Sequence, residues 1–177
     1  MQMSHAKEAR AVTDTDQELL QRLSHGDMDA LGALYDRHAR RVYHLLLARG
    51  LDAPEADEVL PEVFLALAER GRKLRHVENA LAYLLGIARH LAHRYRKQRP
   101  TGPTVEHEAV TGDDDGAMAM AQLLRQLPPE QAEVVVLKVW HGFTFDEIGQ
   151  ALAVSPNTAA SRYRYGIEKL RAMWDEG

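Results

Sequence analysis

Polar and basic side chains gather at the start of a helix predicted near the C-terminus, where they could read DNA. Ser155 is a favourable N-cap, and Pro156 suits the first helical position. A helix that enters the major groove contacts base edges and phosphates with its first two turns. The residues of this candidate reading face are Asn157, Thr158, Ser161, Arg162 and Arg164.

A second group of cations lies along one strip of a helix predicted from Asn79 to Lys97. Between Asn79 and Pro100 the sequence holds five Lys and Arg residues and no acid. A strip of one sign that includes Tyr95 is typical of nucleic-acid binding, although a solvated helix face gives the same pattern. The outward residues are Arg89, His90, His93, Arg94, Arg96 and Lys97.

His90 and His93, one helical turn apart, could instead supply two ligands to a metal ion and so indicate an enzyme. No third ligand is evident nearby, and the flanking arginines would repel a cation. The sequence also lacks a phosphate-binding P-loop, a Gly-rich dinucleotide turn and a nucleophilic serine elbow. We therefore expect no metal, no cofactor and no catalytic residue, with both histidines facing solvent or DNA.

Two consecutive helices position the candidate reading face. Thr144 and Glu147 form a capping box that opens the first helix, and a short turn follows at Ala153. The second helix begins at Pro156 and carries an apolar stripe spaced for burial. This arrangement predicts a helix-turn-helix, with an ordinary hairpin of a helical bundle as the alternative. The stripe consists of Ala159, Tyr163, Ile167, Leu170 and Trp174.

Capping signals also predict the helices of the N-terminal half. Thr15 with Glu18, and Asp52 with Glu55, have the spacing of capping boxes, and Asp27 is the N-cap of a longer helix between them. That longer helix has an apolar stripe of its own. Its members are Leu31, Leu34, Tyr35, Val42, Leu45 and Leu46.

The helix that follows Asp52 has an acidic outward face and contains Pro61, which we expect to bend it because proline removes one backbone hydrogen bond. The polar segment Gly71–Asn79 after it is predicted to be a loop. The outward acids are Asp57, Glu58 and Glu62.

A change in composition divides the chain. The segment Thr101–Gly116 combines glycine and proline with five acids and no base, as expected of a flexible linker. Helices predicted over Met118–Leu127 and Pro129–Trp140 follow, the second because a helical start outweighs the strand propensity of its valine run. The predicted fold is all-α, with two small helical domains at residues 1–100 and 117–177 joined by an acidic linker at 101–116.

The bulk composition restricts the classes of function. With 177 residues and no cysteine, the chain has no disulfide and no cysteine-ligated zinc, which fits a reducing, cytoplasmic location. No apolar run approaches membrane-spanning length. The net charge of −4 disfavours binding to nucleic acid overall, but the two groups of basic residues favour local contact with DNA. Repulsion between DNA and the acidic remainder of the chain should keep the DNA affinity of the free chain low.

Four segments in a fixed order resemble one known family. They are Ala33–Leu46 (ALYDRHARRVYHLL), Glu55–Leu67 (EADEVLPEVFLAL), Ala82–Lys97 (AYLLGIARHLAHRYRK) and Gln126–Arg171. Together they resemble the minimal two-domain type of bacterial extracytoplasmic-function (ECF) sigma factor. The resemblance implies a factor that binds core RNA polymerase and directs promoter-specific initiation, often under the control of an anti-sigma protein and without insertion into a membrane.

The resemblance also implies roles for individual residues. The acids Asp57, Glu58 and Glu62 correspond to the contact with core polymerase, and the helix from Pro156 corresponds to the reader of the −35 element. A helix-turn-helix regulator that works without core polymerase is the alternative, although such a regulator more often uses one reader and a dimer interface. The residues assigned to the −10 element are Arg72, Arg75, Asn79, Arg89, His90, His93, Arg94 and Lys97.

Overall fold

The computed structural model of the chain describes residues 14–98 and 122–175, and all regular elements within them are helical. The predicted linker, the start of the helix predicted over Met118–Leu127 and the basic residue Arg99 lie outside the described residues. The elements are α2 (Asp16–Ser24), α3 (Met28–Ala48), α4 (Ala53–Glu69), η1 (Gly71–His76), α5 (Ala80–Gln98), α7 (Pro129–Val135), η2 (Val136–Trp140), α8 (Phe145–Leu152) and α9 (Pro156–Asp175).

The helix starts predicted from capping residues are confirmed. Thr15 and Asp52 each complete a capping box, which satisfies backbone N–H groups that have no partner within the helix. The Asp27 side chain accepts from the amide of Asp29 at the start of α3. The Asn79 side chain accepts from the amide of Ala82, 2.9 Å away, at the start of α5.

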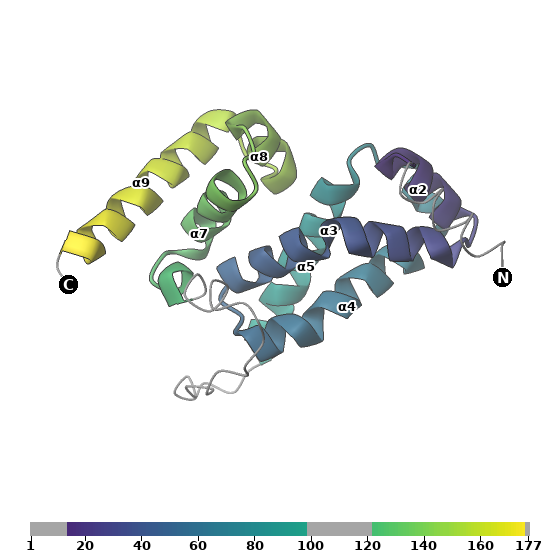
Figure 1. Cartoon of the computed structure of the whole chain (residues 1–177), viewed down its shortest axis with the longest axis horizontal. Helices are drawn as coiled ribbons and strands as arrows, with labels where there is room; N and C mark the ends of the chain where they lie inside the picture. Colours follow the sequence, from purple (N-terminus) through teal and green to yellow (C-terminus); the bar gives the residue numbers. More distant parts are fainter. Residues whose placement is uncertain (1–13, 99–121, 176–177) are drawn as a thin grey trace.

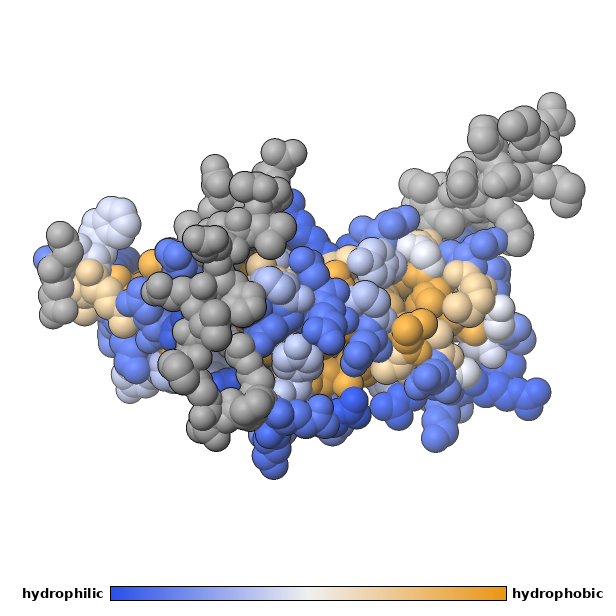
Figure 2. Space-filling model, turned by 90° about the horizontal axis from the view of Figure 1, so that it is seen from below, coloured by the Kyte–Doolittle hydropathy of each residue, from blue (hydrophilic) through white to orange (hydrophobic). Residues whose placement is uncertain are grey.

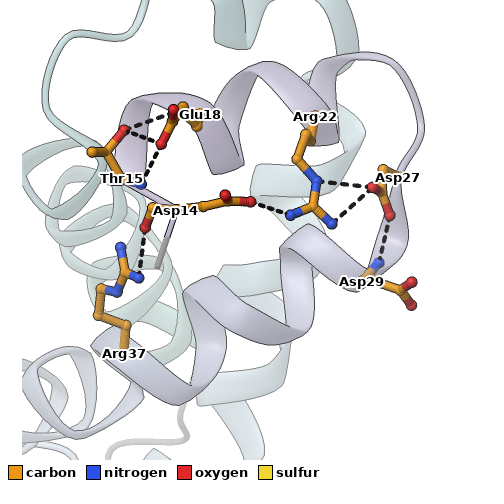
Figure 3. Close-up of polar contacts among 7 residues, drawn as sticks. All are labelled: Asp14, Thr15, Glu18, Arg22, Asp27, Asp29 and Arg37. Carbon is orange, nitrogen blue, oxygen red and sulfur yellow. Dashed lines mark hydrogen bonds and ion pairs between the residues drawn. The ribbon is translucent and has the colours of Figure 1, made fainter. Parts of the chain in front are cut away.

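A network of charged side chains fixes α2 against α3 (Figure 3). Arg22 bridges Asp14 to Asp27, the N-cap of α3. Arg37 on α3 donates to the carbonyl oxygen of Asp14 at 2.9 Å and to the Asp16 carboxylate at 2.6 Å. These contacts orient the first helix across the second.

Helix α4 continues through Pro61, which is exposed, so the helix is not divided there. Its apolar face is buried, at Ala56, Val59, Leu60, Val63, Phe64 and Leu67. The stripe of α3 is buried except at Leu31, which is half-buried, and Tyr35, which is 38% exposed although its ring packs on Phe64.

Two predicted elements differ from the structure in their hydrogen bonding. The predicted loop after α4 contains a 3₁₀ turn, η1, whose Leu74 side chain is fully buried. The predicted helix from Pro129 forms, but its last five residues are π-helical rather than α-helical. The valine run is therefore helical, as expected, with Val134, Val135 and Val136 buried.

The C-terminal helices pack on the N-terminal ones. Figure 1 shows α7 and α8 beside α3 and α5, and the two groups share one hydrophobic core. Val134, Leu137 and Ile148 enter this core from the C-terminal side. The protein therefore has a continuous interface between its two halves.

Only part of the apolar stripe predicted for α9 is buried. Ala159 is fully buried, and Tyr163, Ile167 and Leu170 are half-buried against α7 and neighbouring residues. Trp174, which the stripe predicts to be buried, is 84% exposed. Trp174 is exposed because the C-terminal end of α9 extends beyond α7 (Figure 1).

The surface is mainly polar. Seen from below, apolar side chains lie between charged ones on the half of the molecule that contains α2, α3 and α4 (Figure 2). Exposed apolar residues of α3 and α4 include Met28, Tyr35 and Leu65. No helix among the described residues is long and apolar enough to cross a membrane.

Candidate functional site

The predicted helix-turn-helix is present in α8 and α9. Thr144 and Glu147 complete the capping box of α8, and these hydrogen bonds lower the pKa of the Glu147 carboxyl. Ala153 then takes a left-handed conformation (φ 55°), in the position where helices usually end in glycine. The amide of Val154 donates to the carbonyl oxygen of Gly149 at 3.0 Å and closes the turn.

The first turn of α9 is held by its predicted N-cap. The Ser155 hydroxyl accepts from the amide of Thr158 at 3.0 Å and lies 2.8 Å from the Thr158 hydroxyl. This cap fixes the direction of the helix. Four members of the candidate reading face are exposed to solvent: Asn157, Thr158, Ser161 and Arg164.

The two arginines of the reading face differ. Arg164 is exposed and lies 4.0 Å from Glu168, with its guanidinium 5.0 Å from the centre of the Tyr165 ring. Arg162 is half-buried, and its Nη1 atom is enclosed without a hydrogen-bond partner. Arg164 is thus the more accessible cation in this part of α9.

Close packing anchors α9. Gly166 lies against α7 so tightly that a Cβ atom there would come within 2.9 Å of Val135. The ring of Tyr163 packs on that of Phe145 in α8, with centroids 5.7 Å apart. The requirement for glycine at position 166 is not visible in the local sequence, because it arises from the close approach of α7.

The predicted basic strip is present on α5. His90, His93, Arg94 and Lys97 are exposed along it. Arg96 crosses to the end of α3, where it donates to the carbonyl oxygen of Arg49 at 3.2 Å. A shallow cavity of about 310 Å³ at this end is lined by Arg49, His93, Arg96 and Lys97. These side chains create a surface suited to an anion.

The residues predicted before α5 have different surroundings. Arg72 is exposed on η1. Arg75 interacts with the end of α2, where its side chain lies 3.4 Å from the Ser24 hydroxyl and 2.9 Å from His25 Nε2. Asn79 is exposed and uses its side-chain oxygen to cap α5.

The side chain of Arg89 points away from the basic strip of α5 and toward the C-terminal helices. Its Nε donates to the Glu133 carboxylate on α7 at 3.0 Å, and its Nη1 donates to the carbonyl oxygen of Leu152 at 3.0 Å. Arg49, the C-cap residue of α3, lies 3.3 Å from the same carboxylate oxygen. Glu133 could not be identified from the sequence, because nothing in the surrounding valine run indicates its partners.

Burial governs the charge of this carboxylate. Glu133 is fully buried, and desolvation raises its pKa, while Arg89 and Arg49 act in the opposite direction. Its second oxygen has no hydrogen-bond partner. We call Glu133, Arg49 and Arg89 the Glu133 cluster.

A pair of histidines forms a second polar contact between the halves. His44 Nδ1 on α3 lies 3.2 Å from Nε2 of His141, and the rings stack with centroids 5.1 Å apart. Burial, the neighbouring His44 and the cations Arg41 and Arg40 lower the pKa of His141 to about 4. The His141 ring is therefore favoured as neutral at this contact.

The predicted acidic face of α4 is exposed. Asp57, Glu58 and Glu62 all face solvent. The Glu58 carboxylate accepts from the Tyr95 hydroxyl on α5 at 3.0 Å. Within the described residues, no group of three or more histidine or acidic side chains could hold a metal ion.

Comparison with known families identifies both halves. Residues 34–101 match the family model of sigma-70 region 2, and residues 117–170 match that of sigma-70 region 4. Together the two models cover more than half of the chain, one on each side of the predicted linker.

Individual relatives agree with these matches. The chain is 29% identical to RNA polymerase sigma factor CarQ of Myxococcus xanthus, an alignment that covers 89% of this chain and 96% of CarQ. It is 26% identical to ECF RNA polymerase sigma factor SigK of Mycobacterium ulcerans, with 89% and 92% covered. The solved structure of CnrH in complex with the cytosolic domain of CnrY has a similar fold (TM-score 0.69, 21% identity, 92% and 99% covered).

Proposed function

The chain belongs to the ECF group of bacterial RNA polymerase sigma factors, and we propose that it binds core RNA polymerase and directs it to a subset of promoters. The observation that carries this proposal is the order of the matches, with a region 2 segment at residues 34–101 before a region 4 segment at residues 117–170. Such a factor acts in the cytoplasm by binding polymerase and promoter DNA. The matching families give no support to a regulator that works without polymerase.

The acidic face of α4 is the proposed contact with core polymerase. Asp57 and Glu62 are exposed and supply negative charge to a basic partner surface. Glu58 is also exposed, and its bond to Tyr95 fixes the position of its carboxylate relative to α5. This contact would place the neighbouring basic strip close to the promoter.

The basic strip and the segment before it are the proposed site for the −10 element. His90, His93, Arg94 and Lys97 are exposed for contact with DNA phosphates. Arg72, Arg75 and Asn79 lie near the start of α5, where a base extruded from the duplex would need stabilisation. Arg89 can join this site only after it separates from Glu133.

The first turns of α9 are the proposed reader of the −35 element. Asn157 and Ser161 have the side chains that contact base edges, and Thr158 lies with them on the exposed first two turns. Arg164 is positioned for a phosphate or a guanine, and Arg162 would have to turn outward to join it. We retain residues 1–100 and 117–177 as the two domains, with 101–116 as their linker.

An anti-sigma protein is a further proposed partner. CnrH was solved in complex with the cytosolic domain of CnrY. The present chain has a fold similar to that of CnrH.

Co-elution with sigma-free core RNA polymerase tests the proposed function. We expect the purified chain to elute with polymerase and the variant Glu62→Lys to bind less, because the substitution reverses a charge on the contact face. Glu130→Lys is the charge-matched control, since Glu130 is exposed on α7 and lies outside α4. Tight DNA binding without polymerase binding would refute the proposal.

A further inference from the structure

The C-terminal end of α2 presents two hydrogen-bond acceptors to an arginine of the proposed −10 site. The Ser24 hydroxyl lies 3.4 Å from Nε of Arg75, and Nε2 of His25 lies 2.9 Å from Nη2 of Arg75. A guanidinium only donates hydrogen bonds, so both partners must accept. The carbonyl groups at the end of a helix carry partial negative charge, which also favours a cation there. Arg75 on η1 is therefore bound by a helix that is distant from it in the sequence.

Hydrogen bonds within α2 fix His25 as an acceptor. Its Nδ1 lies 2.7 Å from the carbonyl oxygen of Gln21, which cannot donate, so Nδ1 carries the proton. Nε2 of the same ring then keeps its lone pair for Arg75. The Ser24 hydroxyl donates to the same carbonyl oxygen of Gln21 at 2.7 Å, and its lone pairs also remain for Arg75.

The support on the α2 side of this contact is rigid. Three leucines of α2 are buried in the core, and the charged network around Arg22 fixes the helix against α3 (Figure 3). After His25, Gly26 takes a left-handed conformation (φ 89°). The amide of Asp27 then donates to the carbonyl oxygen of Arg22 at 3.1 Å, as in the Schellman ending of a helix. This ending sets the position of the His25 backbone.

The η1 side of the contact is held by the core as well. Leu74, next to Arg75, is fully buried, and its carbonyl oxygen accepts from the amide of Val77 at 3.1 Å. Both backbones are thus fixed independently of the polar contact. The side chains of His25 and Arg75 meet because the fold places them together.

We propose that His25 is a positioning residue for promoter opening, because it holds the Arg75 guanidinium in place for the −10 element. This inference rests on the proposed function, since it deepens the assignment of Arg75 to the −10 site. A guanidinium has five N–H donors, so the two contacts with α2 leave others for a phosphate or a base edge. A side chain that its neighbours already hold loses less rotamer entropy on binding DNA. The end of α2 therefore prepares a site that must stabilise an extruded base.

Opening of the −10 element by the holoenzyme tests this inference. The template is a promoter mapped for this factor, with 2-aminopurine in its −10 element, whose fluorescence rises when the base leaves the stack. We expect His25→Ala to lower the equilibrium constant for opening by about 3–10-fold, which is the range given by the net contribution of one hydrogen bond. His25→Gln should restore most of the opening, because the glutamine oxygen can accept from Arg75. Gln17→Ala, exposed on the first turn of α2, is the control and should open the promoter like the wild type.

A double-mutant cycle separates positioning from a general effect on stability. On an Arg75→Ala background, His25→Ala should have no further effect on opening, because the side chain that it positions is absent. An undiminished effect of His25→Ala on that background would overturn the inference. Wild-type opening by His25→Ala alone would overturn it as well.

Nitrogen-15 NMR of the imidazole rings measures the contact in the free chain. We expect His25 to carry its proton on Nδ1, and Arg75→Ala to shift the Nε2 resonance because it removes the hydrogen bond, with helicity by circular dichroism unchanged. A His25 ring protonated only at Nε2 would overturn the inference. A wild-type chain that binds polymerase but opens no promoter would instead count against the proposed function, while the ring spectra would still decide whether His25 holds Arg75.

Discussion

The carbonyl oxygen of Val154 lies directly against Gly149, so that a Cβ atom at position 149 would come within 2.8 Å of it. This contact brings the turn of the helix-turn-helix onto α8 and is closed by the hydrogen bond from the Val154 amide. The orientation of the reading helix therefore depends on the absence of a side chain at residue 149.

Gly149→Ala should consequently destabilise the C-terminal helices by about 1–3 kcal/mol, because the turn must move away from α8. Urea denaturation followed by circular dichroism measures this change. Gly86→Ala is the control, since a Cβ atom at this exposed position of α5 meets nothing within 4 Å and alanine favours helix. Equal stability of the two variants would contradict the close approach.

Ala153→Gly should stabilise the chain by roughly 0.5–1 kcal/mol. Ala153 has a left-handed backbone (φ 55°), which costs an L-residue more than glycine, although glycine gains entropy in the unfolded chain. The free energy of unfolding from urea titration tests this expectation. Gln150→Gly, at an exposed position inside the same helix, should destabilise instead. A loss of stability in both variants would refute the assigned turn.

Stability should decrease on acidification through His141. Its pKa is about 4 in the folded chain against an ordinary 6.5, so below pH 6.5 the unfolded chain binds a proton that the folded chain does not. The stabilisation is complete above pH 6.5 and is lost toward pH 4, by about 1–3 kcal/mol after allowance for partial solvent screening. His38, whose pKa burial also lowers, adds in the same direction, and Glu133 opposes it.

Unfolding free energies at pH 7.5 and pH 5 measure this dependence. His141→Gln should reduce the difference between the two values, because glutamine remains neutral and can still bond to His44. An identical difference in the wild-type and variant chains would show that His141 does not contribute.

Arg164→Ala should weaken binding to promoter DNA, because Arg164 is exposed near the start of α9. If Arg164 contacts phosphate, all promoters should be affected alike and the salt slope of binding should fall by about one unit. If it contacts a guanine, the loss should be about 1–3 kcal/mol and depend on sequence. Lys169→Ala, exposed further along the helix, is the charge-matched control, and an equal effect of both variants would refute a specific role.

Local signals were sufficient to predict most helices. Thr15, Asp27, Asp52 and Thr144 each supply a cap through neighbours within three residues, so their role is visible in the sequence. The helix-turn-helix was predictable for the same reason. The all-α fold and both basic islands also follow from local composition and spacing.

Features that depend on distant residues were not predictable. The partners of Glu133 come from α3 and α5, far away in sequence, so its surroundings gave no sign of an ion pair. Trp174 follows the apolar period but lies beyond the helix that covers the rest of the stripe. The assignments of individual residues to polymerase and promoter remain predictions of the family resemblance.

The most direct test of the central claim is transcription by sigma-free core RNA polymerase on host genomic DNA, with RNA 5′ ends mapped in the presence and absence of the purified chain. We predict discrete start sites that appear only when the chain is added and that share sequence elements centred near −10 and −35. An identical set of 5′ ends with and without the chain, under conditions in which another sigma factor is active, would contradict the assignment.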